Sequence, residues 1–323
     1  MSDAAATACG SGWHEEGELA GVALRRSGRG VRVAVVDTGV DAAHPWFADA
    51  RIAHLHVEKK GEGYIVVPDA GGDQSGHGTA CAGIIHRMVP GAELTSVRAL
   101  GPDGRCSRTA LIDALAHCVR AGFHVVNLSL GIDVPRRVPL KPTDHRPILS
   151  LYEVADDAWT AGVVLVASGP NVAAFRTYPG RFKALIGVGR IGAESAGGAH
   201  PPPDASGGAS PPGQGRPDAP PGPPRYAEGA EELERLATSR TEDYEIQAPG
   251  TDVLAPALGG GERRWTGTSF AAPFVTAHVA RVLAARPGLP IESVKAALHQ
   301  MAGAWEGRAS VGAHHPEGVM EAS

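Results

Sequence analysis

The stretch that decides the fold is residues 31–39, Val-Arg-Val-Ala-Val-Val-Asp-Thr-Gly. Its β-branched run predicts a buried strand, and Asp37-Thr38-Gly39 predicts the turn that follows it. Comparable apolar runs recur further along, and stretches with helical apolar spacing lie between them. The strands are expected at 94–100, 125–130, 163–167 and 184–188, and the helices at 79–88, 108–121 and 149–161. This alternation predicts an α/β fold with a mostly parallel central sheet and helices on both faces.

The remainder of the chain fits one domain with an insertion. Gly267 opens a long helical stretch to about residue 285, and a final helix is expected at 291–301. The Pro/Gly-rich segment at about 193–224 is nearly uncharged and predicts a disordered surface insertion, with a short acidic helix at 227–237 after it. We therefore expect an N-terminal extension (1–30), one domain (31–301) that contains the insertion, and a C-terminal tail (302–323).

Composition excludes several classes of protein. The 323 residues carry 30 Lys+Arg against 35 Asp+Glu, a net charge of −5, so no basic excess indicates nucleic-acid binding. No run approaches the ~18 apolar residues of a membrane-spanning helix. The N-terminus has neither the basic nor the apolar region of a signal peptide, and the 4 cysteines contain no CxxC pair. We expect a cytoplasmic protein with reduced thiols, no metal and no cofactor.

Three short constellations carry residues of catalytic type. Asp37 ends a strand, His77 lies in Ser-Gly-His-Gly-Thr, and Ser269 lies in Gly-Thr-Ser-Phe-Ala-Ala-Pro at a helix start. A serine hydroxyl needs a base to take its proton, and a buried carboxylate orients an imidazole for that task. Each piece alone has a plainer interpretation: His77 as a structural histidine and Ser269 as a helix N-cap. A single Asp-Thr-Gly also lacks the second copy that an aspartic protease needs.

Taken together, the motifs resemble the subtilisin-like serine proteases, or subtilases. The resemblance covers about residues 31–301 except the insertion, and the chain order Asp, His, Ser is that of subtilisin. The matching segments are Val35–Val40, Gly76–Thr79, Asn127–Gly131, Ala248–Gly250 and Gly267–Pro273. The resemblance implies a three-layer fold in which Ser269 is the nucleophile, His77 the general base and then acid, and Asp37 the orienting carboxylate.

The resemblance also implies a peptide-binding groove. Two facing segments pair with extended substrate backbone by strand addition: Ser129, Leu130 and Gly131 on one side, and Ala167, Ser168 and Gly169 on the other. Thr177, which precedes Tyr178-Pro179, floors the main specificity pocket, where it indicates a modest, uncharged site. Its alternative interpretation is an ordinary loop residue.

Two positions depart from the pattern typical of the family. Pro170 stands between Gly169 and Asn171, and Asn171 is the only amide nearby, so we expect Asn171 to supply the oxyanion-hole donor. Cys81 follows His77 by one helical turn, as in the proteinase K branch. We expect a buried structural thiol there.

Three functions follow from the sequence. The first is an active serine endopeptidase that works through an acyl-enzyme on peptide or protein substrates. The second is a catalytically weak, subtilase-like peptide-binding or scaffold protein. The third is a dedicated maturation protease that cleaves one leader peptide or partner. The Pro-rich insertion is a candidate site for a protein partner, and the basic stretch 136–146 either contacts acidic residues or is a solvated loop.

Overall fold

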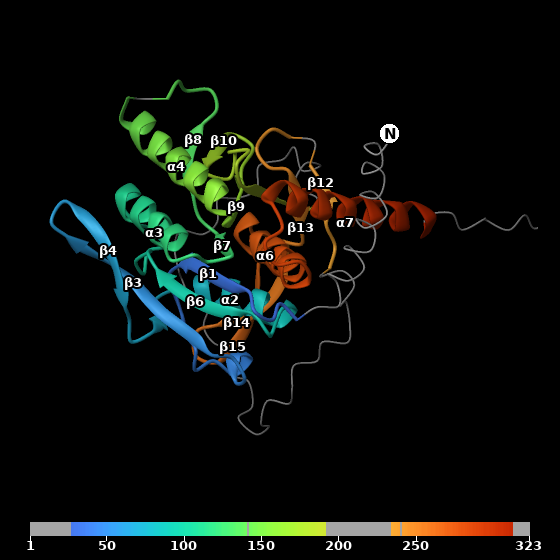
Figure 1. Ribbon diagram of the computed structural model, residues 1–323, viewed down its shortest axis with the longest axis horizontal. Coiled ribbons are helices and arrows are strands. Elements are labelled where there is room, and N and C mark those ends of the chain that lie inside the picture. Colours follow the sequence, from blue (N-terminus) through green and yellow to red (C-terminus); the bar gives the residue numbers. More distant parts are fainter. Residues whose placement is uncertain (1–26, 141, 192–233, 240, 313–323) are drawn as a thin grey trace, which may run out of the picture.

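A nine-stranded sheet runs through the computed structural model, which describes residues 27–140, 142–191, 234–239 and 241–312 (Figure 1). The strand order is β12 (Ala237–Thr238), β13 (Ile246–Ala248), β11 (Ile186–Arg190), β9 (Val164–Ser168), β7 (Val125–Leu128), β1 (Arg32–Asp37), β6 (Glu93–Arg98), β3 (Ile52–Lys60), β4 (Gly63–Pro68). Neighbouring strands are parallel from β13 to β3, and only the two edge pairs, β12 with β13 and β3 with β4, are antiparallel. The expected mostly parallel sheet is confirmed.

Helices cover both faces of this sheet because side chains alternate along each strand. Val33 and Val35 of β1 belong to a core shared with α2 (His77–Met88), α6 (Thr268–Ala285) and α7 (Ile291–Gly312). Ala34 and Val36 belong to a second core, shared with α3 (Arg108–Arg120) and α4 (Pro142–Ala161). The helices α3 and α4 lie side by side (Figure 1). The three-layer arrangement is therefore as expected.

Helix α6 is buried along most of its length, from Thr268 to Leu283. It packs on β7, β9 and β11 and is flanked by α2 and α7, so a helix that is apolar almost all round has no face left for water. Among the described helices, none is both long and apolar enough to cross a membrane.

Helix α4 begins at Pro142, seven residues before the expected start, so part of the basic stretch 136–146 is helical. Pro147 lies inside this helix and has no N–H to donate to the Thr143 carbonyl one turn earlier. The Arg108 guanidinium donates to that carbonyl instead, at 3.1 Å. The proline is thus accommodated by a side chain from α3.

Other differences concern small elements. The helix expected at 291–301 continues to Gly312. Of the acidic helix expected at 227–237, the described residues form a turn and strand β12, while the Pro/Gly-rich segment 193–224 lies outside the described residues. Three two-stranded sheets and a 3₁₀ turn had no counterpart in the sequence predictions: β2 (Gly39–Val40) with β5 (Gly72–Asp73), β8 (Ile132–Pro135) with β10 (Phe175–Tyr178), β14 (Val253–Ala257) with β15 (Gly261–Trp265), and η1 (Pro45–Phe47).

Candidate active site

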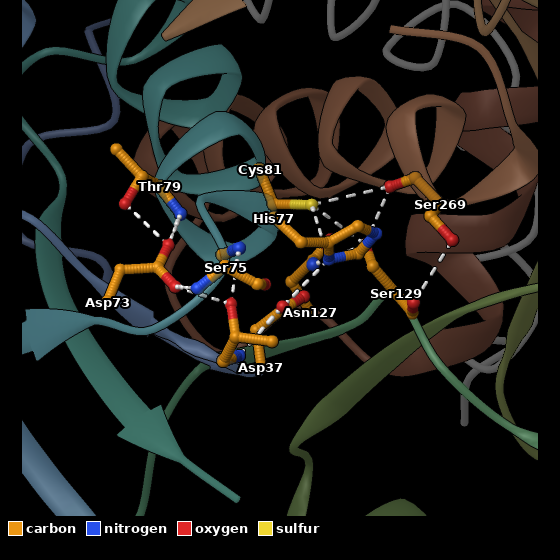
Figure 2. Close-up of polar contacts among 11 residues, drawn as sticks. Asp37, Asp73, Ser75, His77, Thr79, Cys81, Asn127, Ser129 and Ser269 are labelled. Atoms are coloured by element: carbon orange, nitrogen blue, oxygen red, sulfur yellow. Dashed lines mark hydrogen bonds and ion pairs between the residues drawn. The ribbon is translucent and has the colours of Figure 1, made fainter. Parts of the chain in front are cut away.

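The three catalytic-type residues are positioned by the ends of three elements. Asp37 is the last residue of β1, His77 the first of α2, and Ser269 the second of α6. Parallel strands direct all their carboxyl ends to one edge of the sheet, where ligands bind in open α/β folds. Figure 2 shows the three side chains gathered in one group.

Asp37 and His77 form a short hydrogen bond, 2.7 Å from His77 Nδ1 to Asp37 Oδ1. The carboxylate is 1% exposed, and the backbone N–H of Thr38 also donates to Oδ1. Burial lowers the pKa of His77, but the charge of Asp37 and this hydrogen bond raise it more, so the pKa lies well above its usual value. The pair is therefore arranged to stabilise the imidazolium that forms when His77 accepts a proton.

The start of α2 depends on two glycines. Gly76, the N-cap, has φ of 85°, a conformation that favours glycine. A Cβ on Gly78 would lie 2.1 Å from the backbone oxygen of Gly39, so this close approach of α2 to the turn after β1 requires glycine at position 78. The N–H of Gly78 donates to Thr38 Oγ1 at 3.0 Å. These contacts hold His77 over Asp37.

Asp73, which the sequence analysis did not single out, supplies the cap that Gly76 lacks. Its Oδ2 accepts from the backbone N–H of Thr79 at 2.8 Å and from Thr79 Oγ1 at 2.6 Å (Figure 2). Its Oδ1 accepts from Thr38 Oγ1 at 2.7 Å. Burial raises the pKa of Asp73, but its hydrogen bonds lower the pKa by more than burial raises it, so the net shift is downward. An acidic residue four positions before the histidine is the sequence signal for this role.

Ser269 is tied to the segment that follows β7. Its Oγ donates to the backbone oxygen of Ser129 at 3.1 Å, and in return Ser129 Oγ donates to the backbone oxygen of Ser269 at 2.7 Å. Ser129 Oγ also accepts from Asn127 Nδ2 at 3.0 Å. The Ser269 carbonyl is free for this contact because Pro273, four residues on, has no N–H to offer it.

Cys81 lies beneath the imidazole, with no exposed surface and its Sγ 4.0 Å from His77 Nδ1. Burial raises the pKa of the thiol, which keeps it protonated. Within the described residues, the one group of three metal-ligand side chains is Asp37, His77 and Cys81. In that group the ligand atom of His77 is already hydrogen-bonded to Asp37.

The orientation of the Asn171 side-chain amide is fixed by the hydrogen bonds that its oxygen accepts. Asn171 Oδ1 accepts from the backbone N–H of Thr268 at 2.8 Å and from Thr268 Oγ1 at 3.2 Å. An N–H can donate only to the oxygen of the amide, so the orientation is set and Nδ2 is the atom left to serve as a donor. Pro170 does not remove Asn171 from the site, because Asn171 lines the same cleft as Ser269.

A cleft of about 480 Å³ joins these groups. Ser129, Leu130, Gly131, Ser168, Gly169 and Thr177 all line it, together with His77, Asn171 and Ser269. Ala167 is not among the lining residues, and its role in substrate binding stays a prediction. Its side chain is completely buried, and β9 lies between β7 and β11, so its backbone is enclosed within the central sheet.

The cleft also contains charged residues that the motifs did not indicate: Asp103, Asp133 and Arg263. Thr177 Oγ1 donates to Asp133 Oδ1 at 2.5 Å. The pocket wall at Thr177, expected to be uncharged, therefore carries a carboxylate. Asp133 escaped notice because it faces Thr177 only through the pairing of β8 with β10.

Several serine proteases are similar to this chain in sequence. Subtilisin BL of Lederbergia lenta is 33% identical over 173 residues, which cover 50% of this chain and 56% of that protein. The thermophilic serine proteinase of Bacillus sp. (strain AK1) is 26% identical over 292 residues, 86% of this chain and 58% of that protein. The chain thus spans somewhat more than half the length of these two relatives.

Solved structures show the same fold. A cold-adapted subtilisin-like serine proteinase superposes with a TM-score of 0.56 at 20% identity, over 85% of this chain and 83% of the other. The prenylagaramide maturation protease PagA superposes with a TM-score of 0.52 at 20% identity, over 80% and 78%. Residues 28–318 match the sequence profile of the subtilase family, peptidase S8. With most of its length matched and its fold shared, the chain belongs to the subtilase family.

Proposed function

We propose that the chain is a serine endopeptidase in which Ser269, His77 and Asp37 hydrolyse peptide bonds through an acyl-enzyme. The observation that carries this proposal is the 2.7 Å bond between His77 and buried Asp37, beside the cleft that Ser269 also lines. Such a pair gives an imidazole the orientation a general base needs, and membership of the subtilase family supports the same chemistry.

In the proposed reaction, Ser269 Oγ attacks the substrate carbonyl while His77 takes its proton, and Asp37 stabilises the imidazolium. A serine has one O–H, so the hydrogen bond from Ser269 Oγ to the Ser129 carbonyl must first be exchanged for one to His77. Asn171 Nδ2 donates to the oxyanion of the tetrahedral intermediate. His77 then protonates the leaving amine, and water hydrolyses the acyl-enzyme by the reverse sequence.

The substrate is proposed to be an extended peptide or protein segment. The segments 129–131 and 168–169 both line the cleft and offer main-chain groups for strand addition. Thr177 lies at the pocket wall, where a side chain of the substrate would be held.

The test is labelling with a fluorophosphonate, read by intact mass. Wild type should gain one adduct, and Ser269→Ala should gain none. His77→Ala should react far more slowly, because nothing else takes the proton. Ser75→Ala is the matched control, since Ser75 also lines the cleft and is exposed, and it should label like wild type. An adduct that survives in Ser269→Ala contradicts the proposal.

The hydrogen bond from Ser269 Oγ to Ser129 favours one alternative, a catalytically weak peptide-binding protein. In that case folded wild type would take up no fluorophosphonate, yet an unlabelled peptide would bind and raise the unfolding temperature.

We further propose an intracellular, dedicated role, such as maturation of one leader peptide or partner protein. An intracellular serine protease of Paenibacillus polymyxa, 26% identical over 272 residues, and the maturation protease PagA among the structural matches support this. Incubation with unstructured casein separates a dedicated protease from a general one. A dedicated enzyme should leave most of the casein intact, and complete digestion would contradict the dedicated role.

A further inference from the structure

One wall of the cleft is the small sheet formed by β8 and β10. In its register Asp133 stands opposite Thr177. Ile132 and Val134, on either side of Asp133, are buried in the core, so alternation along the strand turns Asp133 the other way, toward the cleft that it lines. The hydrogen bond from Thr177 Oγ1 then fixes the carboxylate by one oxygen.

Among the residues that the structure describes, no cationic side chain pairs with the carboxylate of Asp133. Thr177 is its one hydrogen-bond partner among the described residues, and none of the ion pairs there includes it. The second carboxylate oxygen is left for a ligand. Asp133 is exposed, so its carboxylate does not bear the desolvation cost of a deeply buried group.

Arg263 is the one Arg or Lys among the cleft-lining residues, and its contacts are with the His77 side of the site and not with Asp133. The Arg263 guanidinium stacks on the Trp265 ring, 3.4 Å from its centre, and Trp265 meets the His77 ring edge-on at 6.4 Å. His77 must protonate the leaving amine, so Arg263 lies near the leaving group. Asp133 instead lies two residues after segment 129–131 and is hydrogen-bonded to Thr177.

We propose that Asp133 selects substrates with Lys or Arg as the residue whose carbonyl carbon Ser269 attacks. This inference rests on the proposed function. An ammonium or guanidinium group in the Thr177 pocket would form a charge-assisted hydrogen bond with the free oxygen of Asp133, whereas an apolar side chain would leave it unpaired. Because the carboxylate is exposed, we expect a preference of about tenfold.

The experiment uses peptidyl diphenyl phosphonates that differ only in the side chain next to phosphorus: Lys, Gln or Leu. Ser269 Oγ attacks phosphorus and phenol departs, so intact mass reports the rate without any need for turnover. Wild type should react with the Lys probe about tenfold faster than with the others. Asp133→Asn, which keeps an oxygen for Thr177, should bring the ratio of rates to about one. Asp103→Asn, the matched control, should keep the wild-type ratio.

The controls separate failure of this inference from failure of the proposed function. Fluorophosphonate does not depend on the pocket, so its failure to label Ser269 refutes the proposed function and this inference with it. Labelling by fluorophosphonate together with equal rates for the three phosphonates refutes only the role of Asp133. If Asp133→Asn does not fold, the salt dependence of the wild-type rates provides the test. The preference for the Lys probe should fall severalfold between about 50 mM and 1 M salt, and an unchanged preference overturns the inference.

Discussion

Substituting Ser129 by alanine should destabilise the fold at the nucleophile. Ser129 Oγ is buried and makes three hydrogen bonds. It accepts from Asn127 Nδ2 and weakly from Cys81 Sγ, and it donates to the Ser269 carbonyl, so the two stronger bonds are those to Asn127 and Ser269. Its removal leaves both groups without these partners, and each such group costs about 1–3 kcal/mol. The Cys81 thiol, 3.6 Å from the same carbonyl, remains as a weak donor and offsets part of this. We expect a loss of about 2–4 kcal/mol in the free energy of unfolding.

Urea unfolding followed by far-UV circular dichroism measures this loss. Ser75→Ala, which removes an exposed hydroxyl, should change the free energy by less than about 0.5 kcal/mol. A second background tests the reason for the cost. Pro273→Ala restores a backbone N–H one turn after Ser269, so the carbonyl regains a helical donor. In that background, Ser129→Ala should cost about 1 kcal/mol less than in wild type.

Two results would refute this reasoning. One is a change below about 0.5 kcal/mol for Ser129→Ala in the wild-type background. The other is an equal cost in the two backgrounds, which would show that Pro273 does not determine the partner of the Ser269 carbonyl.

Three further predictions address single residues. Asn171→Asp keeps an oxygen for the N–H of Thr268 but has no amide donor, so peptide turnover should fall about 100- to 1000-fold while the unfolding midpoint changes little; turnover within a few-fold of wild type would exclude the oxyanion role. An organomercurial should stop fluorophosphonate labelling of wild type and not of Cys81→Ser, because mercury on the buried sulfur would displace the His77 ring; inhibition that persists in the variant contradicts this placement. Burial lowers the pKa of His278 from 6.5 to about 4, outweighing the charge of Glu234. The unfolded chain therefore binds the proton first, stability should fall by about 3 kcal/mol as pH drops from 6.5 to 4, and His278→Gln should flatten that part of the urea-midpoint profile.

The sequence predicted what depends on local pattern and on motif. Val33 and Val35 against Ala34 and Val36 already indicate a strand with two covered faces, and the segment around Ser269 predicts helix α6 closely. It failed where a distant partner decides the outcome. Pro142–Arg146 looked like a loop because the Arg108 donor that satisfies this proline-interrupted helix lies far away in the sequence.

The site, like the fold, was predictable from the sequence only in part. Motifs identify Asp37, His77 and Ser269, but they carry no information about Asp133, whose position depends on the register of two short strands. The same limit applies to Ala167, which does not line the cleft. A residue near the end of an apolar strand can line a groove or lie inside the sheet. Which of the two occurs depends on the flanking strands, and therefore on the strand order.

The burial of α6 has a consequence for timing during synthesis. Every strand of the central sheet precedes this helix in the chain, so a nascent chain can pair its strands while one face of the sheet still lacks its main covering helix. The same helix delivers Ser269. Closure of the core and arrival of the nucleophile are therefore a single event, and a half-folded chain holds an imidazole and a carboxylate but nothing for them to activate.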